Sequence, residues 1–368
     1  MPGSGPSLLA VPRLNSWASQ WDQLVDLSPI PSPFLRSWWL AGVSGPRSRF
    51  LLTVQSDRLL GGLALEEGRR LGLPRLRMMG SGSLCPDHLD LLARPGHEDA
   101  VVGAVRAWLR RPGPRLLDME SIPGNSRLVA ALPGHVHRES QAGAPWAALP
   151  NDPETYLAAR PAGLRKTLRR ASARLAAEGV SHRVQRGPSV AQSLETLRRL
   201  HEAQWGNRSR FLPDFHRFAA ACRLGAQFDE VAVHELAVGE TVIAIMASFE
   251  VARRVSLYQS ARLTEFRWCD ATTVLLNAAI ADACARGFTE VDFLRGEEAY
   301  KRNFAPERRE LLRLRTANGW AGRVALAMET TARKARRAAG RRSHDNRPLR
   351  QHEDRGTRPT PRAGHLSR

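Results

Sequence analysis

The strongest constraint on the fold of this chain is the order of helix and strand signals between residues 189 and 318. Apolar residues at helical spacing alternate there with short segments of strand-like alternation. Gly239 lies in a tight turn and predicts a hairpin between two of these strands. The expected order is helix, helix, three antiparallel strands, helix, strand, short helix, strand. The first two helices are expected at 189–204 and 213–224, and the three strands at 228–237, 241–250 and 253–261. A helix at 271–286 and a strand at 290–293 follow, and the last strand, after the short helix, is expected at 310–316.

Length and composition predict a second domain before this segment. The chain has 368 residues, 42% of them apolar and 25% charged, which is typical of globular proteins with about 100 to 200 residues per domain. Residues 1–150 are expected to form a mixed α/β half without obvious chemistry. Its expected elements are strands near 50–55 and 59–65, a helix near 99–110, a strand at RLLDMES, a short helix from Asn125, and a strand pair near Val136 and Trp146.

The formal net charge of +19 is concentrated at the C-terminus. Residues 332–368 hold twelve Arg and Lys against three Asp and Glu, so the rest of the chain is only moderately basic. An Ala/Arg-rich helix is expected over 319–340, and a disordered tail over 341–368, where large apolar residues are scarce. The preference for Arg over Lys suggests a GC-rich bacterial genome. Because no nucleic-acid-binding motif accompanies the charge, a nucleic-acid partner is not expected from it.

Cysteine spacing and the absence of targeting signals indicate the cellular compartment in which the protein is expected. Cys85, Cys222, Cys269 and Cys284 are widely spaced, without a CxxC pair, so we expect neither disulfides nor a metal site. No signal peptide and no stretch of about 18 apolar residues is visible, which predicts a cytoplasmic protein without a membrane span. The missing GxSxG and P-loop motifs argue against a hydrolase or an ATP-binding protein.

Residues 151–188 are expected to connect the two halves through a basic amphipathic helix and a strand. Leu164, Leu168 and Leu175 recur at helical spacing among five cationic side chains: Arg165, Lys166, Arg169, Arg170 and Arg174. Two interpretations stay open. The helix either packs one apolar stripe and exposes a solvated basic face, or it uses that face to bind an anionic ligand or partner.

Three stretches together resemble a known family. They are GLRKTLRRASARL with the following Gly179, LRRLHEAQWGNRSRF, and RRVSLYQSARLTEFRWCDATTVLLNAAIADACARGFTEVDFLRGEEAYKRNF. They are similar to GNAT-superfamily acyltransferases of the CelD-like group, linked to cellulose biosynthesis, and more distantly to the FemAB peptidoglycan aminoacyltransferases. The resemblance covers about residues 34–316, including SWWLAG and PDHLDLLARPG more loosely. It implies two tandem GNAT-like halves, each a mixed, mainly antiparallel twisted sheet flanked by helices, the first degenerate and the second, 189–318, catalytic.

The resemblance also implies an acyl-CoA-dependent N-acyltransferase that needs no covalent enzyme intermediate. In such folds the cofactor pyrophosphate is held by backbone amides at a helix start, which here is near Asp270. The loop RLTEFRWCDATT departs from the family because it contains no glycine, and Asp270 can equally be an N-cap. The expected cofactor-binding residues are Arg262, Arg267, Thr272, Thr273, Arg295 and Gly296.

The expected catalytic residues are Tyr258, Asp292, Tyr300 and Lys301. Asp292 follows a strand, and a tyrosine hydroxyl could protonate the leaving thiolate. Structural alternatives are an ion pair of Asp292 with Arg295 or Lys301, and simple sheet packing for Tyr258. The expected acceptor-binding residues are Trp205, Asn207 and Arg208. His201 is expected to be a packed histidine, and the strand carboxylates of Glu235 and Glu250 to lie on the surface.

The acceptor is expected to be an amine of a small molecule or sugar precursor, with no metal required. Two other functions stay open. A FemAB-like transferase would use aminoacyl-tRNA, and the basic helix over 162–177 favours that reading. A non-catalytic binding protein would keep the fold after losing its cofactor loop, as the glycine-free loop allows.

Overall fold

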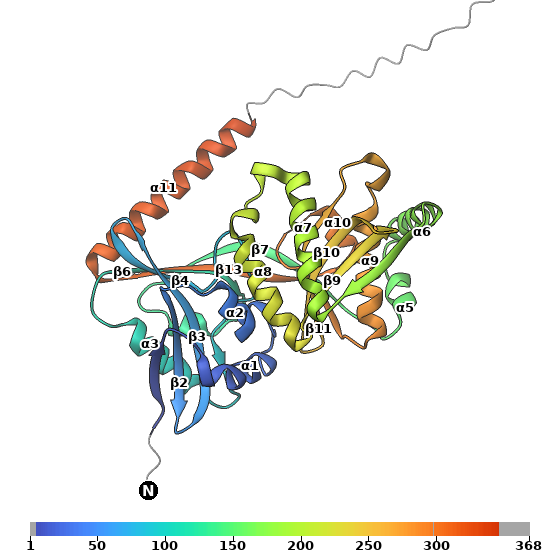
Figure 1. Cartoon of the computed structure of the whole chain (residues 1–368). Helices are drawn as coiled ribbons and strands as arrows, with labels where there is room; N and C mark the ends of the chain where they lie inside the picture. The colour runs from blue at the N-terminus through green and yellow to red at the C-terminus, as the bar shows by residue number, and fades with distance from the viewer. Residues whose placement is uncertain (1–4, 297, 346–368) are drawn as a thin grey trace, which may run out of the picture.

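In the part of the chain that the structure describes, a single 13-stranded sheet runs through both halves of the molecule (Figure 1). The computed structural model describes residues 5–296 and 298–345, and its strand order is β1-β2-β3-β4-β6-β13-β7-β12-β11-β10-β9-β8, with β5 paired to β3. The strands are β1 (Ser7–Val11), β2 (Ser48–Gln55), β3 (Arg58–Arg70), β4 (Leu73–Met78), β5 (Leu92–Ala93), β6 (Arg115–Pro123), β7 (His137–Ala148), β8 (Val180–Gln185), β9 (Val231–Val238), β10 (Thr241–Val251), β11 (Arg254–Arg262), β12 (Glu290–Asp292) and β13 (Glu307–Asn318).

Helices flank this sheet, and two groups of them occupy equivalent places in the two halves. The helices are α1 (Ala18–Asp26), α2 (Ser37–Val43), α3 (Glu98–Leu109), α4 (Leu128–Ala131), α5 (Pro153–Ala158), α6 (Ala162–Ala177), α7 (Val190–Trp205), α8 (Phe215–Gly225), α9 (Ala271–Ala285), α10 (Ala299–Phe304) and α11 (Gly319–Asp345). The two equivalent groups are α1–α4 and α7–α10. Apart from the short β5, the order β1, α1, α2, β2, β3, β4, α3, β6, α4, β7 recurs as β8, α7, α8, β9, β10, β11, α9, β12, α10, β13. The two expected halves therefore share one element order.

Each half contributes its last strand to the other half. β7, which ends the first half, pairs with β12 of the second, and β13, which ends the second, pairs with β6 of the first. β7 and β13 also pair with each other, so the sheet is continuous across the junction. The expected boundary at residue 150 therefore puts β7 in a different half from β12 and β13, the strands with which it pairs. The pair of strands expected near Val136 and Trp146 is wrong, because β7 runs unbroken through both.

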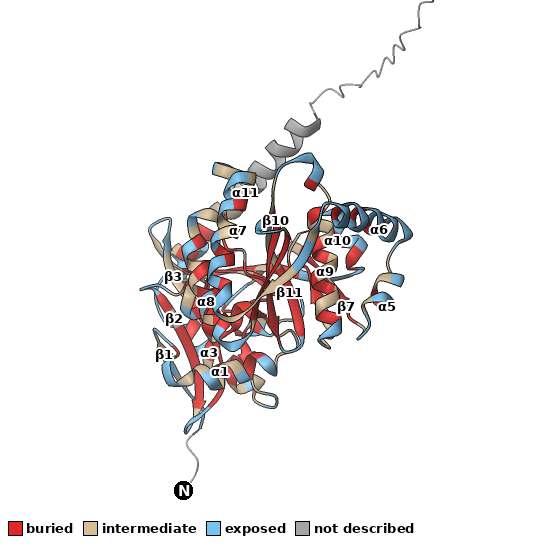
Figure 2. Ribbon diagram, turned by 45° about the vertical axis from the view of Figure 1, so that its right-hand side comes forward, coloured by how far each residue is buried: buried red, intermediate tan, exposed pale blue. Residues whose placement is uncertain are grey.

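Buried residues follow the strands and the inner faces of the helices (Figure 2). The larger cluster joins the halves, since Phe34 and Trp39 of the first half contact Phe249 and Tyr258 of the second edge-on. Helices α2 and α8 also touch across the junction. A Cβ on Gly42 would lie 2.4 Å from the Ala221 backbone, so only glycine allows this approach.

Helix α6 buries Leu164, Leu168 and Leu175 and leaves most of its basic residues exposed. Its apolar stripe belongs to the second hydrophobic cluster, with α9. This confirms the packing that the leucine spacing predicted; a role in binding an anion stays untested. Within the described part of the chain, every helix is too short or too polar to span a bilayer.

The C-terminal helix α11 leaves the body of the molecule after β13 (Figure 1). Its first turns are held by Ala325 and Leu326, which pack against Leu116 of β6. The helix ends at Asp345 rather than near residue 340, because Arg341 and Arg342, which are good helix formers, follow Gly340. The remainder of the expected disordered tail, 346–368, lies outside the described residues.

Candidate functional site

Strands β11 and β12 run parallel for only three residues and then part. The parallel pairing joins Arg254, Val255 and Ser256 to the three residues of β12. Beyond it β11 continues along β10 as far as Arg262. The chain after β12 turns instead to β7, where the Phe293 amide donates to Pro145 and the Gly296 amide to Gly143. The second half thus has a parting in its sheet, and Tyr258 lies beside it.

A loop of the first half occupies this parting. Residues 79–91 follow β4, and their backbone and side chains contact both diverging strands. The Tyr258 hydroxyl donates to the Leu84 carbonyl, and the Arg295 guanidinium donates to the Pro86 carbonyl. Leu84 and Leu89 of this loop are buried. The parting in the second half is therefore filled by a loop of the first half.

Arg295 is held by the first half through several bonds. Its Nε and its backbone amide each donate to the Asp87 carboxylate at 2.6 Å, and its guanidinium also donates to the Ser121 hydroxyl. Asp87 is buried, and burial raises its pKa against the opposing effects of Arg295 and His88. The ion pair expected between Asp292 and Arg295 is therefore wrong, because Arg295 pairs with Asp87 across 208 positions of sequence.

Asp292 lies at the end of β12 and is fully buried among cationic groups. One of its oxygens accepts the Leu294 amide at 2.7 Å, and the other lies 2.9 Å from His88 Nε2, 3.6 Å from Arg309 and 4.0 Å from Arg254. Burial, the largest single effect, would raise the pKa of Asp292. The neighbouring His88 and Arg254, with the Leu294 amide, outweigh it and lower that pKa to about 2.

His88 is buried in a strained conformation. Its backbone has φ of +53°, where a non-glycine residue is uncommon. Its contact with Asp292 has the length of a hydrogen bond but not the angle, and neither of its ring nitrogens has a hydrogen-bond partner among residues 5–296 and 298–345. A buried imidazole beside an ionised carboxylate, with neither ring nitrogen committed to a hydrogen bond among the described residues, has the geometry of a general base.

Helix α10 lies next to this cluster. The buried Lys301 donates from Nζ to the Arg295 carbonyl at 2.8 Å and lies 3.1 Å from Glu298. Gly296 has φ of +124°, and a Cβ there would come within 2.8 Å of Lys301 Nζ, so this turn requires glycine. The expected pairing of Lys301 with Asp292 is thus wrong. Tyr300 is exposed, and among the described contacts its hydroxyl makes no hydrogen bond with this cluster.

Tyr258 packs in the core and also contacts the loop of the first half. Its ring packs with Phe34, Trp39, Phe218 and Phe249, as sheet packing predicted. Its hydroxyl reaches the loop at Leu84 instead of lying on a bare sheet face. The desolvating surroundings raise the pKa of Tyr258, so the phenol keeps its proton at neutral pH.

The start of α9 carries the expected cofactor-binding residues. Asp270 occupies the N-cap position but makes no capping hydrogen bond, because its carboxylate pairs with Arg174 of α6 at 2.9 Å. The first-turn amides near Thr272 and Thr273 therefore meet no capping side chain in the described structure. Arg267 is exposed beside Glu265, and the Arg262 guanidinium donates to the Leu263 carbonyl. This helix start can hold an anion without a glycine-rich loop.

The expected acceptor-binding residues lie apart from both places. Trp205 ends α7, and Asn207 and Arg208 follow it in a short 3-10 turn, all three exposed. His201 is buried against Phe211, as a packed histidine should be, and its Nε2 lies 2.9 Å from the Ser209 hydroxyl. The structure brings together Tyr258, Asp292, Arg295, Gly296 and Lys301, and it separates them from the α9 start and from Trp205, Asn207 and Arg208.

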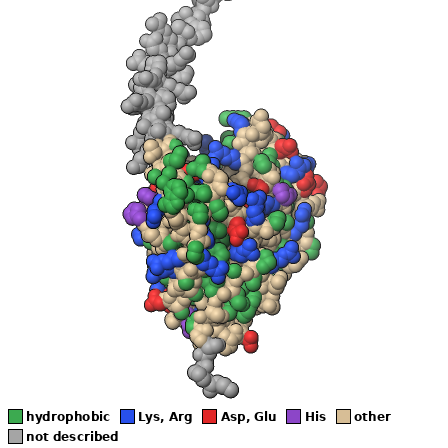
Figure 3. All heavy atoms as spheres, turned by 90° about the vertical axis from the view of Figure 1, so that its left-hand side faces the viewer, with side chains coloured by type: hydrophobic (Ala, Val, Ile, Leu, Met, Phe, Trp, Pro, Cys, Tyr) green, Lys and Arg blue, Asp and Glu red, His purple; other side chains and the backbone are tan. Residues whose placement is uncertain are grey.

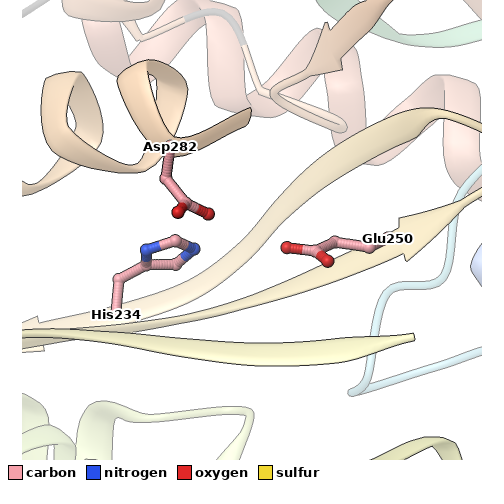
Figure 4. Close-up of side chains that lie close together, drawn as sticks. All are labelled: His234, Glu250 and Asp282. Atoms are coloured by element: carbon pink, nitrogen blue, oxygen red, sulfur yellow. The ribbon is translucent and has the colours of Figure 1, made fainter. Parts of the chain in front are cut away.

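A second polar cluster lies between strands β9 and β10 and helix α9. His234, Glu250 and Asp282 have possible ligand atoms within 4.8 Å of one another (Figure 4). Arg186 donates twice to Glu250 and once to Asp282, and Arg286 also donates to Glu250. A cation would have to displace these guanidinium groups, so the arrangement fits an ion-pair network. Glu235 is likewise buried and paired, with Arg183, so the surface position expected for Glu235 and Glu250 is wrong.

This cluster predicts acid sensitivity. Burial, followed by His182, lowers the pKa of His234 from 6.5 to about 3. Between these values the unfolded chain binds a proton that the folded chain does not, so the free energy of unfolding should fall with falling pH, by at most about 1.4 kcal/mol per pH unit. We expect His234→Gln to have a flatter profile from pH 7 to pH 5 in urea unfolding. The exposed His216→Gln is the control, and equal slopes for both variants would contradict the assignment.

A mixed sheet with a parting between two parallel strands, followed by a helix with an uncapped start, is typical of the GNAT class of fold. Residues 162–302 match the family described as the acetyltransferase (GNAT) domain. The chain therefore contains a GNAT-fold acetyltransferase domain, and the tandem mixed α/β architecture that the sequence predicted is confirmed. No curated protein matches the sequence.

Solved structures share this fold across most of the chain at low identity. FemX is 10% identical with a TM-score of 0.59, covering 80% of this chain and 95% of its own. The C-terminal domain of a protein titled a lysylphosphatidylglycerol synthetase, from Agrobacterium fabrum, is 12% identical with a TM-score of 0.56, covering 86% and 96%. L-PGS from Bacillus licheniformis is 11% identical with a TM-score of 0.55, covering 87% and 96%.

Sequence reasoning missed the contribution of the first half. Asp87 and His88 were within the quoted stretch PDHLDLLARPG, but no local pattern assigned them chemistry. The same holds for Arg254 and Arg309, which were hidden by the abundance of arginine. The available signal was the dense group of Asp and His between two turn-forming residues, Pro86 and Gly96, in a half without other chemical motifs.

Proposed function

We propose that this protein is an acyl-CoA-dependent N-acyltransferase that transfers an acetyl or other acyl group to an amine of a small molecule or sugar precursor. The observation that carries the proposal is the match of residues 162–302 to the acetyltransferase (GNAT) domain. The uncapped start of α9 and the parting of β11 and β12 both support it. A cytoplasmic bacterial protein of the CelD-like group remains the expectation from the sequence.

The described residues at the start of α9 fit the anionic part of a cofactor. The first-turn amides of α9, with Arg262, Arg267, Thr272 and Thr273, would hold a pyrophosphate. Acyl-CoA, when bound, supplies an activated acyl thioester. Binding there requires neither a glycine-rich loop nor a metal, because the helix amides and arginine side chains supply the hydrogen bonds and the positive charge.

The chemical roles fall to the cluster around Asp292. The incoming amine must lose a proton and the departing sulfur must gain one. Tyr258 holds its proton at neutral pH and would donate it to the sulfur. With a pKa of about 2, Asp292 is itself a weak base, so its part would be to orient His88, whose ring nitrogens would accept the amine proton. Arg295, Gly296, Tyr300 and Lys301 would shape the surrounding wall.

This proposal requires the loop over residues 79–91 to move. The loop now accepts the Tyr258 hydroxyl bond and contacts Asp292, so an acyl group could meet these side chains only after it shifts. Trp205, Asn207 and Arg208 would then meet the acceptor from the α7–α8 connection.

A second candidate is aminoacyl transfer from tRNA. FemX, L-PGS and the C-terminal domain of the lysylphosphatidylglycerol synthetase align with at least 80% of the chain at TM-scores above 0.5. The exposed basic face of α6, which includes Arg165, Arg169 and Arg170, would suit a phosphate backbone. Similarity at 10 to 12% identity establishes the fold alone, so the acyl-CoA reading is preferred on the family match.

Calorimetric titration with acetyl-CoA and longer acyl-CoAs tests the first candidate. We expect binding, and a loss of about tenfold in affinity for Arg267→Ala, which removes one exposed charge at the α9 start. Arg58→Ala, which replaces an exposed arginine at the start of β3, is the matched control and should bind as the unaltered protein does. No binding of any acyl-CoA would overturn the proposal. Salt-sensitive binding of aminoacyl-tRNA, weakened by Arg170→Ala, would then favour the second candidate.

A further inference from the structure

Helix α11 carries an exposed apolar stripe. Trp320, Val324 and Met328 are 75%, 50% and 62% exposed, and all three belong to the first turns of the helix. Their spacing of four residues places them on one side of the helix. Figure 3 shows apolar side chains gathered beside the beginning of the grey segment, with Lys and Arg side chains around them. Three large apolar side chains exposed in a row are unusual on a protein surface and mark a contact site.

The opposite side of α11 is anchored, so the stripe has a fixed direction. Ala325 and Leu326 are buried against Leu116. A Cβ on Gly322 would lie 3.0 Å from the Arg115 carbonyl, so the helix approaches β6 closely. Glu329 pairs with Arg70 of β3 at 2.6 Å. These contacts hold the helix to the sheet and keep the stripe outward.

The positive charge of the sequence after this apolar stripe indicates which kind of partner the stripe contacts. Between residues 332 and 368 the sequence has twelve Arg and Lys against three Asp and Glu. A second copy of this chain would bring the same cationic segments together and be repelled. A nucleic acid would neutralise the charge but would give Trp320, Val324 and Met328 no apolar contact. An anionic bilayer provides both, because its headgroups attract cations and its interface accepts tryptophan and aliphatic side chains.

We propose that α11 lies along the surface of an anionic phospholipid membrane. Trp320, Val324 and Met328 enter the interface, and the cationic C-terminal sequence is held by the lipid headgroups. The inference goes beyond the proposed transferase activity and does not depend on it, because it uses neither the parting of β11 and β12 nor the start of α9.

Cosedimentation of the full chain with phospholipid vesicles tests the proposal. We expect binding to vesicles that contain phosphatidylglycerol and not to pure phosphatidylcholine vesicles, with binding reduced by added salt. The triple variant Trp320→Ser, Val324→Ser, Met328→Ser should lose more than about tenfold in partitioning, since each side chain loses its apolar burial. The control is the double variant Phe228→Ser, Phe266→Ser, which removes two exposed aromatic side chains elsewhere and should partition as the unaltered protein does.

A second readout locates the contact. Brominated phospholipid should quench part of the tryptophan fluorescence, and Trp320→Phe should abolish most of that quenching while the protein still binds. Equal partitioning of the triple variant and the unaltered protein would overturn the proposal, because the charge alone would then explain adsorption. Absence of vesicle binding, or self-association that the triple variant abolishes, would overturn it as well. Titration of the triple variant with acetyl-CoA separates this result from any failure of the proposed activity.

Discussion

Replacing Arg295 with methionine is expected to lower the free energy of unfolding by about 3–5 kcal/mol. Methionine retains an unbranched chain but removes the guanidinium that binds Asp87, Pro86 and Ser121. The Asp87 carboxylate would then stay buried without its main partner, and an uncompensated buried charge is among the most costly defects in a protein. Urea unfolding at pH 7 measures the change.

A matched control separates this effect from loss of charge alone. Arg267→Met removes an arginine whose partner Glu265 is also exposed, and should cost less than about 1 kcal/mol. The double variant Asp87→Asn, Arg295→Met should recover a large part of the loss, because the buried carboxylate is removed as well. Similar losses for Arg295→Met and Arg267→Met would show that the contact between the halves contributes little to stability.

Replacing Asp292 with asparagine is expected to cost about 3 kcal/mol at pH 7. The change removes the carboxylate next to His88, Arg254 and Arg309. The loss lies at the lower end of the range for buried pairs because Glu290 still binds both arginines, Arg254 at 2.7 Å and Arg309 through two bonds of 2.7 Å. The free energy of unfolding in urea checks this value.

The effect of Asp292→Asn should depend on pH with a defined sign. The pKa of Asp292 falls from its ordinary value of 3.8 to about 2 in the folded protein, so its ionised form stabilises the fold above pH 3.8. This contribution is lost as the pH falls through 2, and the difference between the two proteins should shrink over that window. Asp57→Asn, in an exposed turn, is the control and should show no such window. A constant difference down to pH 2 would contradict the assigned ion pairs.

Both predictions concern contacts that no local pattern could reveal. Asp87 and Arg295 are 208 positions apart, and the pairing of Asp292 with His88 spans a similar distance. Spacing rules describe neighbours within one helix or strand, whereas this contact depends on the loop after β4 reaching the parting of two distant strands. The sequence therefore indicated Asp292 and Arg295 as candidates, but the partners that it offered as a structural alternative, Arg295 or Lys301 for Asp292, are not the ones found.

The sequence by itself determined the local structure of most segments and their order. The helices near 190–205 and 215–225, the hairpin at Gly239 and the leucine stripe of α6 follow from periodicity and turn chemistry, which act over a few residues. The sequence did not predict the solvent exposure of Glu235 and Glu250 correctly. Strand alternation placed them on the surface, but helices and arginine side chains cover both faces of the sheet, so both are buried.

Only the tertiary structure decided how the two halves join. β7 and β13 are ordinary strands by sequence, and nothing in their residues states which half each would complete. Their exchange follows from backbone pairing and from burial of one shared core, both of which depend on the whole chain being assembled. The candidate site arises from that assembly, because it places the loop over residues 79–91 against Tyr258, Asp292 and Arg295.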